Sequence, residues 1–266
     1  MPQVRINDID CYYEIHGGGK PLVLIAGLAS DSQSWQPVLQ GLAAYFKVII
    51  FDNRGIGRTG YPRESFQISK LALDTISLLD RLAIEKADIL GHSMGGCIAQ
   101  EIAIEYPQRV DKLVLVSTCA VISQRNKFLF ADLLKILESG KNYELFIREF
   151  FGLIFSSQYL ADKERTDAAV KYAVNYPFAV SSDGFRLQLE ALSSFDARQK
   201  LQKIAARTLI MAGKKDMLVS LEDGQLLEKK IPFAKSLFLD DAAHAFQVEQ
   251  PDLFTGSLVE FLSQKC

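Results

Sequence analysis

The chain has 266 residues, of which 48% are hydrophobic and 23% are charged, and its formal net charge is −2. This composition is typical of a globular domain, and a charge so close to zero gives no electrostatic footprint for nucleic acid or for an anionic membrane. Segment 1–20 is polar where a signal peptide would need an apolar core, and no apolar run reaches the length of a membrane span. We therefore expect a cytoplasmic domain without nucleic-acid or membrane partners.

Strands and helices alternate through the first half of the chain. After a β region at 4–17, continuous apolar runs predict strands buried on both faces at 21–27, 87–93 and 111–118, and one at 47–55 that runs into a glycine-rich loop. Apolar residues at helical spacing predict helices at 68–84 and 96–106, and at 34–46 with Ser34 as the N-cap. This alternation implies βαβ units and hence a mostly parallel sheet with helices on both faces.

The pattern changes between residues 119 and 206. Helical patterns continue there without a buried strand, and half of the chain's phenylalanine and tyrosine residues fall in this third of its length. Strand patterns return at 207–213 and 235–240, and a helix is expected at 253–265. The fold class is therefore α/β, with a core of residues 1–118 and 207–266 and a helical cap at 119–206 inserted after the sixth strand. The aromatic side chains either form a small core of their own or line a pocket.

Ser93 lies in the stretch ILGHSMGGCIA, between a predicted strand and a predicted helix. The pattern Gly-x-Ser-x-Gly, here Gly91 to Gly95, is typical of a nucleophile on a tight strand-to-helix turn, where neighbours must be small because strand and helix approach closely. The N–H groups at the start of the following helix are suited to stabilise an oxyanion. An ordinary turn is the competing interpretation, but the strand before Ser93 and the helix after it favour a nucleophile.

A serine nucleophile needs a base, and the chain has three histidines. His16 lies in the N-terminal β region, and His92 adjoins Ser93 at a corner where neighbouring side chains diverge. His244 follows the last predicted strand, at the carboxyl edge of the sheet, where the sites of open α/β sheets form. We therefore predict that His244 is the base.

The base in turn needs a carboxylate that fixes its tautomer and stabilises the imidazolium. Asp216 follows the strand predicted at 207–213, again at the carboxyl edge of the sheet. Asp240 and Asp241 are closer to His244 in the sequence, but such near neighbours rarely reach the correct ring nitrogen. We therefore predict a catalytic triad of Ser93, His244 and Asp216.

The order serine, aspartate, histidine on this scaffold, with GHSMGG, FDNRGIGRT, LIMAGKKDMLV and DDAAHAFQVEQPDLF, resembles the α/β-hydrolase fold superfamily, close to its small bacterial carboxylesterases and enol-lactonases. The resemblance covers almost the whole chain and implies an oxyanion hole formed by the backbone N–H groups of Leu28 and Met94. Relatives commonly have His-Gly in the first of these loops, whereas this chain has Ala26-Gly27, so a side-chain hydrogen bond that fixes the loop is missing. Candidates to replace it are Ser30, Asp31, Ser32 and Ser34.

This chemistry predicts a serine hydrolase that cleaves small carboxylic esters through an acyl-enzyme. Enol-lactonase, thioesterase and acyl-carrier-protein methyl ester esterase activities are alternatives within the same chemistry, and a triad-bearing receptor with little turnover is an alternative of another class. The pocket is expected to be apolar, with candidate substrate-binding residues Trp35, Phe128, Phe146, Phe150, Phe151, Phe155 and Phe178.

We expect a small-molecule ester as the ligand and neither a cofactor nor a metal. A faint excess of basic over acidic residues in the cap does not establish docking of an acyl carrier protein. The expected oligomeric state is a monomer or a homodimer. The four cysteines, Cys11, Cys97, Cys119 and Cys266, lack metal-ligand or redox spacing, so reduced thiols are expected.

Overall fold

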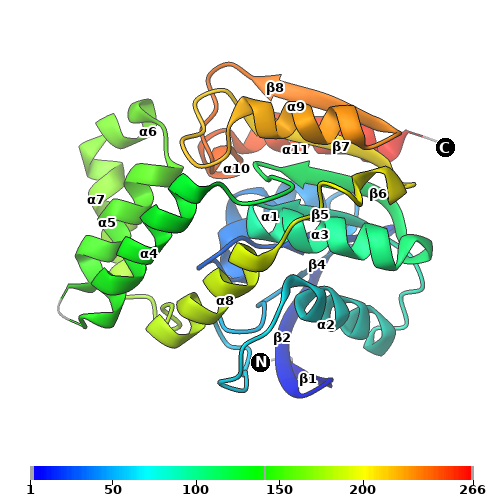
Figure 1. Cartoon of the computed structure of the whole chain (residues 1–266). Helices are drawn as coiled ribbons and strands as arrows, with labels where there is room; N and C mark the ends of the chain where they lie inside the picture. The colour runs from blue at the N-terminus through cyan, green and yellow to red at the C-terminus, as the bar shows by residue number, and fades with distance from the viewer. Residues whose placement is uncertain (1–2, 141, 265–266) are drawn as a thin grey trace.

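The computed structural model describes residues 3–140 and 142–264. Within these residues, eight strands form a single sheet in the order β1-β2-β4-β3-β5-β6-β7-β8 (Figure 1). β2 is antiparallel to both β1 and β4, and all neighbouring strands from β4 to β8 are parallel, as predicted. The strands are β1 Gln3–Ile6, β2 Ile9–His16, β3 Pro21–Ile25, β4 Lys47–Phe51, β5 Ala87–His92, β6 Val110–Val116, β7 Arg207–Gly213 and β8 Ala234–Leu239.

Side chains alternate between the two faces of the sheet, and each face has its own hydrophobic core. In β3, Val23 and Ile25 share a core with residues of α2, α3 and α9, whereas Leu22 and Leu24 share the opposite core with residues of α1 and α11. All four side chains are fully buried, which explains the continuous apolar run in the sequence. The helices of the core are α1 Gln36–Ala43, α2 Ile68–Arg81, α3 Met94–Glu105, α9 Leu221–Lys230, α10 Phe246–Glu249 and α11 Pro251–Ser263.

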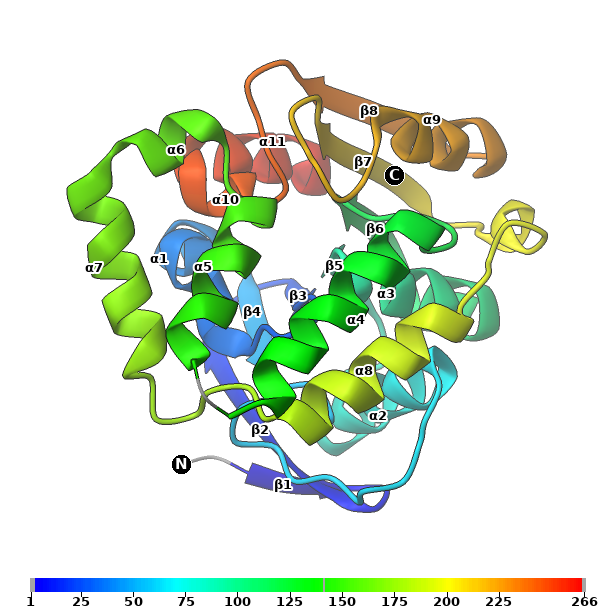
Figure 2. The same cartoon turned by 60° about the vertical axis from the view of Figure 1, so that its left-hand side comes forward.

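The segment between β6 and β7 forms the cap, which contains α4 Gln124–Glu138, α5 Tyr143–Ile154, α6 Ser157–Ala161, α7 Lys163–Val174 and α8 Ser182–Ser194. Figure 2 shows these helices as a layer in front of the ends of β3 and β5. Each begins at a polar N-cap whose side chain accepts a backbone N–H, so the local sequence sets where it starts. The segment inserted after the sixth strand is therefore helical, as predicted.

Some helix boundaries differ from those the sequence predicts. The helix expected at 34–46 begins as a 3₁₀ turn, η1 (Ser32–Trp35), whose N-cap is Asp31 because its carboxylate accepts the N–H of Gln33 at 2.9 Å. Ser34 lies inside this turn. The apolar pattern does not predict α9, whose start is fixed by a capping box between Ser220 and Asp223. The expected end of the last helix at residue 265 lies outside the described residues.

Cys11, Cys97 and Cys119 are buried free thiols, and Cys266 lies outside the described residues. In the part of the chain that the structure describes, no helix combines the length and the apolar character that a membrane span requires.

Candidate active site

Ser93 occupies a sharp turn between β5 and α3. Its φ of +55° and ψ of −120° lie outside the regions that residues with a side chain favour. A Cβ atom on Gly91 would lie 2.1 Å from the carbonyl O of Gly95, and one on Gly95 would lie 2.1 Å from the carbonyl O of Ile25. The turn is anchored by the N–H of Ser93, which donates to the carbonyl O of Val116 at 2.9 Å. The two glycines are therefore required by the close approach of strand and helix.

Asp216 and His244 follow two neighbouring parallel strands, β7 and β8, and meet at the carboxyl edge of the sheet. Oδ2 of Asp216 lies 2.8 Å from Nδ1 of His244, and Oδ1 accepts the N–H groups of Leu218 and Val219 at 2.8 and 2.9 Å. Burial raises the pKa of the Asp216 carboxyl, but His244 and the two N–H groups outweigh burial and hold this pKa below its usual value. An ionised carboxylate at Nδ1 keeps the ring proton there, which leaves Nε2 free to act as a base.

His92 lies next to His244, with ring centroids 4.9 Å apart, but it serves a different partner. Its Nε2 donates to the carbonyl O of His244 at 2.9 Å. Burial, assisted by the neighbouring His244, lowers the pKa of His92 to about 3, so the ring is neutral at neutral pH. His92 therefore supports the main chain at His244. The third histidine, His16, pairs with Glu14 on β2 at 2.8 Å.

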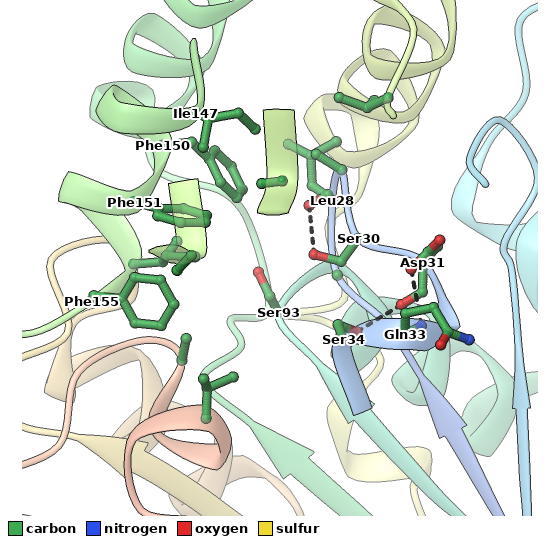
Figure 3. Close-up of a pocket in the computed structure, with 18 of the residues that line it drawn as sticks. Leu28, Ser30, Asp31, Gln33, Ser34, Ser93, Ile147, Phe150, Phe151 and Phe155 are labelled. Atoms are coloured by element: carbon green, nitrogen blue, oxygen red, sulfur yellow. Dashed lines mark hydrogen bonds between the residues drawn. The ribbon is translucent and has the colours of Figure 1, made fainter. Parts of the chain in front are cut away.

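A cavity of about 480 Å³ is bordered by Ser93 and His244. The cap supplies one wall and residues of segment 27–37 supply the opposite wall. Figure 3 shows Ser93 between Phe151 and Phe155 on the cap side and Leu28 and Ser30 on the loop side. The aromatic residues that line the cavity are Phe130, Tyr143, Phe146, Phe150, Phe151, Phe155, Tyr159, Tyr172, Tyr176 and Phe178.

The charged groups at the cavity are few and already engaged. The described residues that line it include no lysine or arginine, and one acidic residue, Asp31. The hydroxyl of Tyr176 donates to Asp31 Oδ2 at 2.6 Å, and the guanidinium of Arg58 lies 3.6 Å from the same oxygen. Asp31 is therefore occupied by protein partners, and the cavity has no cationic side chain for a ligand carboxylate.

The two predicted oxyanion donors come from different elements. Leu28 lies in the loop after β3 and lines the cavity, and Met94, directly after Ser93, is the first residue of α3. Among the described residues, no protein acceptor is found for the backbone N–H of either residue. An N–H without an intrahelical partner is expected at the start of a helix, as at Met94.

A family model described as the α/β hydrolase fold matches residues 20–251. The chain belongs to the α/β-hydrolase fold family. A protein named putative carbamate hydrolase RutD, from Azorhizobium caulinodans, is 32% identical, and the match covers 99% of each chain. Among solved structures, a hydrolase from Pseudomonas aeruginosa matches with a TM-score of 0.90 at 26% identity, covering 99% of this chain and 98% of its own. An enol-lactonase from Burkholderia xenovorans shares the fold, with a TM-score of 0.90 at 24% identity over 99% and 100% of the two chains.

Two of the pocket residues predicted for this α/β-hydrolase do not line the cavity. Phe128 is 68% exposed on the outer side of α4, whereas Phe130 is buried and lines the cavity, because residues two positions apart in a helix point in different directions. Trp35 is buried in the core, with its ring edge-on to His92 at 6.3 Å. Phe128 and Trp35 therefore lie outside this cavity, whereas the other five predicted phenylalanines line it.

The sequence prediction also missed the four tyrosines of the cavity wall, Tyr143, Tyr159, Tyr172 and Tyr176. The signal was present in the sequence, because the aromatic enrichment of the cap includes these tyrosines as well as phenylalanines. The hydroxyl of one of them, Tyr176, is the donor to Asp31 described above.

Proposed function

We propose that this α/β-hydrolase cleaves uncharged carboxylic esters through a covalent acyl-enzyme on Ser93. The observation that supports this proposal most directly is that Ser93, on its strained turn, and His244 border the same cavity, while Asp216 lies behind His244 and is hydrogen-bonded to it. The nucleophile, the base and the group that orients the base are the three parts that acyl transfer by a serine requires.

In the first half of the proposed reaction, Oγ of Ser93 attacks the carbonyl carbon of the ester while Nε2 of His244 takes the hydroxyl proton. The bond from that carbon to the leaving oxygen then breaks, and His244 gives the proton to the departing alcohol. In the second half, water attacks the acyl carbon, His244 takes a proton from the water and returns it to Ser93, and the carboxylic acid leaves. The N–H groups of Leu28 and Met94 stabilise the oxyanion in both halves.

The lining of the cavity supports an apolar, uncharged substrate. Aromatic side chains dominate the cap wall, and no lysine or arginine is found among the described lining residues. A substrate with its own carboxylate would bury that charge without a cationic partner, which is strongly unfavourable. This favours simple esters over lactones that carry a free carboxylate.

Carbamates are a second candidate, because the relative from Azorhizobium caulinodans carries the name of a putative carbamate hydrolase and matches this chain over 99% of its length. The carbonyl carbon of a carbamate reacts by the same two steps, with a carbamoyl group on Ser93 in place of an acyl group. The relative rates of ester and carbamate hydrolysis separate the two candidates.

The test uses purified full-length protein, the variant Ser93→Ala, and a panel of p-nitrophenyl acyl esters, a p-nitrophenyl carbamate, a lactone and an acyl thioester. We expect the wild type to hydrolyse apolar esters with multiple turnovers, and Ser93→Ala to lose at least about a thousandfold in kcat. A fluorophosphonate is expected to label the wild type at Ser93, as identified by peptide mass spectrometry.

Ester hydrolysis retained by Ser93→Ala would contradict the proposed mechanism. Tight binding of an ester by the wild type without turnover would instead indicate a receptor that retains the fold. A carbamate that is cleaved faster than every ester would replace the ester proposal with the second candidate.

A further inference from the structure

The loop after β3, residues 26–34, carries the proposed oxyanion donor Leu28 and is called the oxyanion loop below. Its first residue, Ala26, has no side chain that can form a hydrogen bond. The hydroxyl groups of the loop serines make only local contacts, although the backbone N–H of Ser32 donates to Oδ1 of Asp52 at 2.9 Å. The Oγ atom of Ser30 lies 3.5 Å from the carbonyl O of Leu28, at the limit of a hydrogen bond, and the Oγ atom of Ser34 donates to the carbonyl O of Asp31. The loop must therefore be held against the rest of the protein by other groups.

Three consecutive peptide groups of this loop each take part in a hydrogen bond that reaches beyond the neighbouring residue. The carbonyl O of Ala26 accepts from Nδ2 of Asn53 at 3.1 Å, and the carbonyl O of Gly27 accepts from the N–H of Ser30 at 3.3 Å. The N–H of Ala29 donates to Oε1 of Gln188 at 3.3 Å. The peptide that carries the Leu28 N–H is the middle one, so side-chain amides fix the peptides on both of its sides.

Gln188 comes from the cap, on α8, and it is fully buried. Its Nε2 donates to the carbonyl O of Arg54 at 2.9 Å, so one side chain bridges the oxyanion loop and the loop after β4. The same helix approaches that second loop very closely, because a Cβ atom on Gly184 would lie 2.0 Å from the carbonyl O of Gly55. Gln188 is thus held at both ends, on a helix with little room to shift toward the core.

Ala29 has a φ of +61°, a left-handed conformation that residues other than glycine adopt infrequently. Such a backbone persists only where the surroundings hold it in place. The hydrogen bond from the Ala29 N–H to Gln188 is a restraint of this kind, and it acts directly beside Leu28.

We propose that Gln188 is a positioning residue that couples the cap to catalysis by fixing the direction of the Leu28 N–H. The inference rests on the proposed serine hydrolase function. It assigns the cap a role beyond enclosing the substrate: correct seating of α8 is needed to stabilise the oxyanion. Loss of Gln188 is therefore expected to lower kcat rather than to raise KM.

The test compares Gln188→Met, which keeps the size of the side chain and removes both hydrogen bonds, with Glu190→Gln as the matched control. Glu190 is on the same helix and contacts the core through Ser65, at 3.0 Å, without touching the oxyanion loop. For Gln188→Met we expect kcat to fall by about 10- to 100-fold with KM changed by less than about threefold. A boronic acid, whose tetrahedral adduct places an oxygen near the Leu28 N–H, should lose affinity by a similar factor. The control should match the wild type.

A Gln188→Met enzyme with wild-type kcat, or with its loss confined to KM, overturns the proposal. If that variant does not fold, Gln188→Asn is tested in its place. Its shorter amide cannot reach the Ala29 N–H, but it keeps the polarity of the site. A folded Gln188→Asn enzyme with wild-type kcat also overturns the proposal. Hydrogen exchange of the peptide containing residues 26–34 should be faster in the Gln188 variants. This measurement does not depend on activity, whereas an inactive, unlabelled wild type contradicts the proposed function itself.

Discussion

Asp216, Asp240 and Asp241 all follow strands at the carboxyl edge of the sheet, yet their surroundings differ. Asp216 is buried and accepts three hydrogen bonds, one of them from His244. Asp240 and Asp241 are exposed and pair with Lys214 and Lys215. The carboxylate that contacts His244 is therefore determined by the pairing of β7 with β8, which brings the ends of these two strands together, and not by proximity along the chain.

Replacement of Asp216 by asparagine is expected to lower kcat for ester hydrolysis by about 10⁴-fold, because an amide at this position no longer holds the proton on Nδ1 of His244. The change is nearly isosteric, so the circular dichroism spectrum should be retained. The variants Asp240→Asn and Asp241→Asn serve as controls and should stay within about twofold of the wild type. A severe loss in either control, with an active Asp216→Asn, would show that the assignment of the acid is wrong.

At the level of elements, the site depends on how closely α3 packs against β3 and β5. The Ser93 turn brings the first turn of α3 so near to β3 that backbone atoms nearly touch at Gly95. This contact places the start of α3, with the free N–H of Met94, beside the end of β3, with that of Leu28. Close packing of the elements therefore sets the positions of the two proposed oxyanion donors.

The substitution Gly95→Ala tests this packing. The added Cβ would lie 2.1 Å from the carbonyl O of Ile25 and 2.8 Å from that of Ala26, both of them rigid backbone atoms. We expect the free energy of unfolding, measured with urea, to fall by about 3 kcal/mol or more. Gly256→Ala in α11, where no atom lies within 4 Å of the new Cβ, should instead be neutral or stabilise by up to about 1 kcal/mol. Equal effects at the two sites would refute the close contact.

For the molecule as a whole, the cavity at Ser93 forms only when the core and the cap come together, because residues of both line it. Several hydrogen bonds join the two parts near the site. The N–H of Ala245 donates to the carbonyl O of Ile154, and the N–H and hydroxyl of Ser156 donate to Glu249, which lies on α10. Since Ala245 is adjacent to His244, the cap is tied to the loop that carries the proposed base as well as to the loop after β3.

The aromatic lining, which has no lysine or arginine among the described residues, predicts a strong charge preference. Replacing p-nitrophenyl pentanoate with p-nitrophenyl hemisuccinate, which has a similar length and a free carboxylate, should lower kcat/KM by about 100-fold or more, because the carboxylate would be buried unpaired. Steady-state rates at pH 7 measure the ratio. Equal values of kcat/KM for the two esters would mean that a charged substrate end reaches solvent or finds a cation, and the uncharged substrate class would have to be abandoned.

The sequence by itself determined the alternation of strands and helices and the candidate triad. Strands buried on both faces must be continuously apolar. The glycines around Ser93 are needed because strand and helix approach closely at this turn, and this requirement is visible in the local sequence. His244 and Asp216 could be chosen because both follow strands of a parallel sheet, whose carboxyl ends necessarily share one edge. Local patterns and the topology they imply were sufficient for these predictions.

Only the tertiary structure decided which side chains form the cavity and what holds the oxyanion loop. The sequence pattern does not reveal that Phe130 faces inward while Phe128 faces solvent, because this depends on the side from which α4 meets the core. Gln188 lies in an ordinary amphipathic helix, and its two partners, Ala29 and Arg54, are distant in the chain. Contacts of this kind leave no local pattern, since they are set by the way the cap is seated on the sheet.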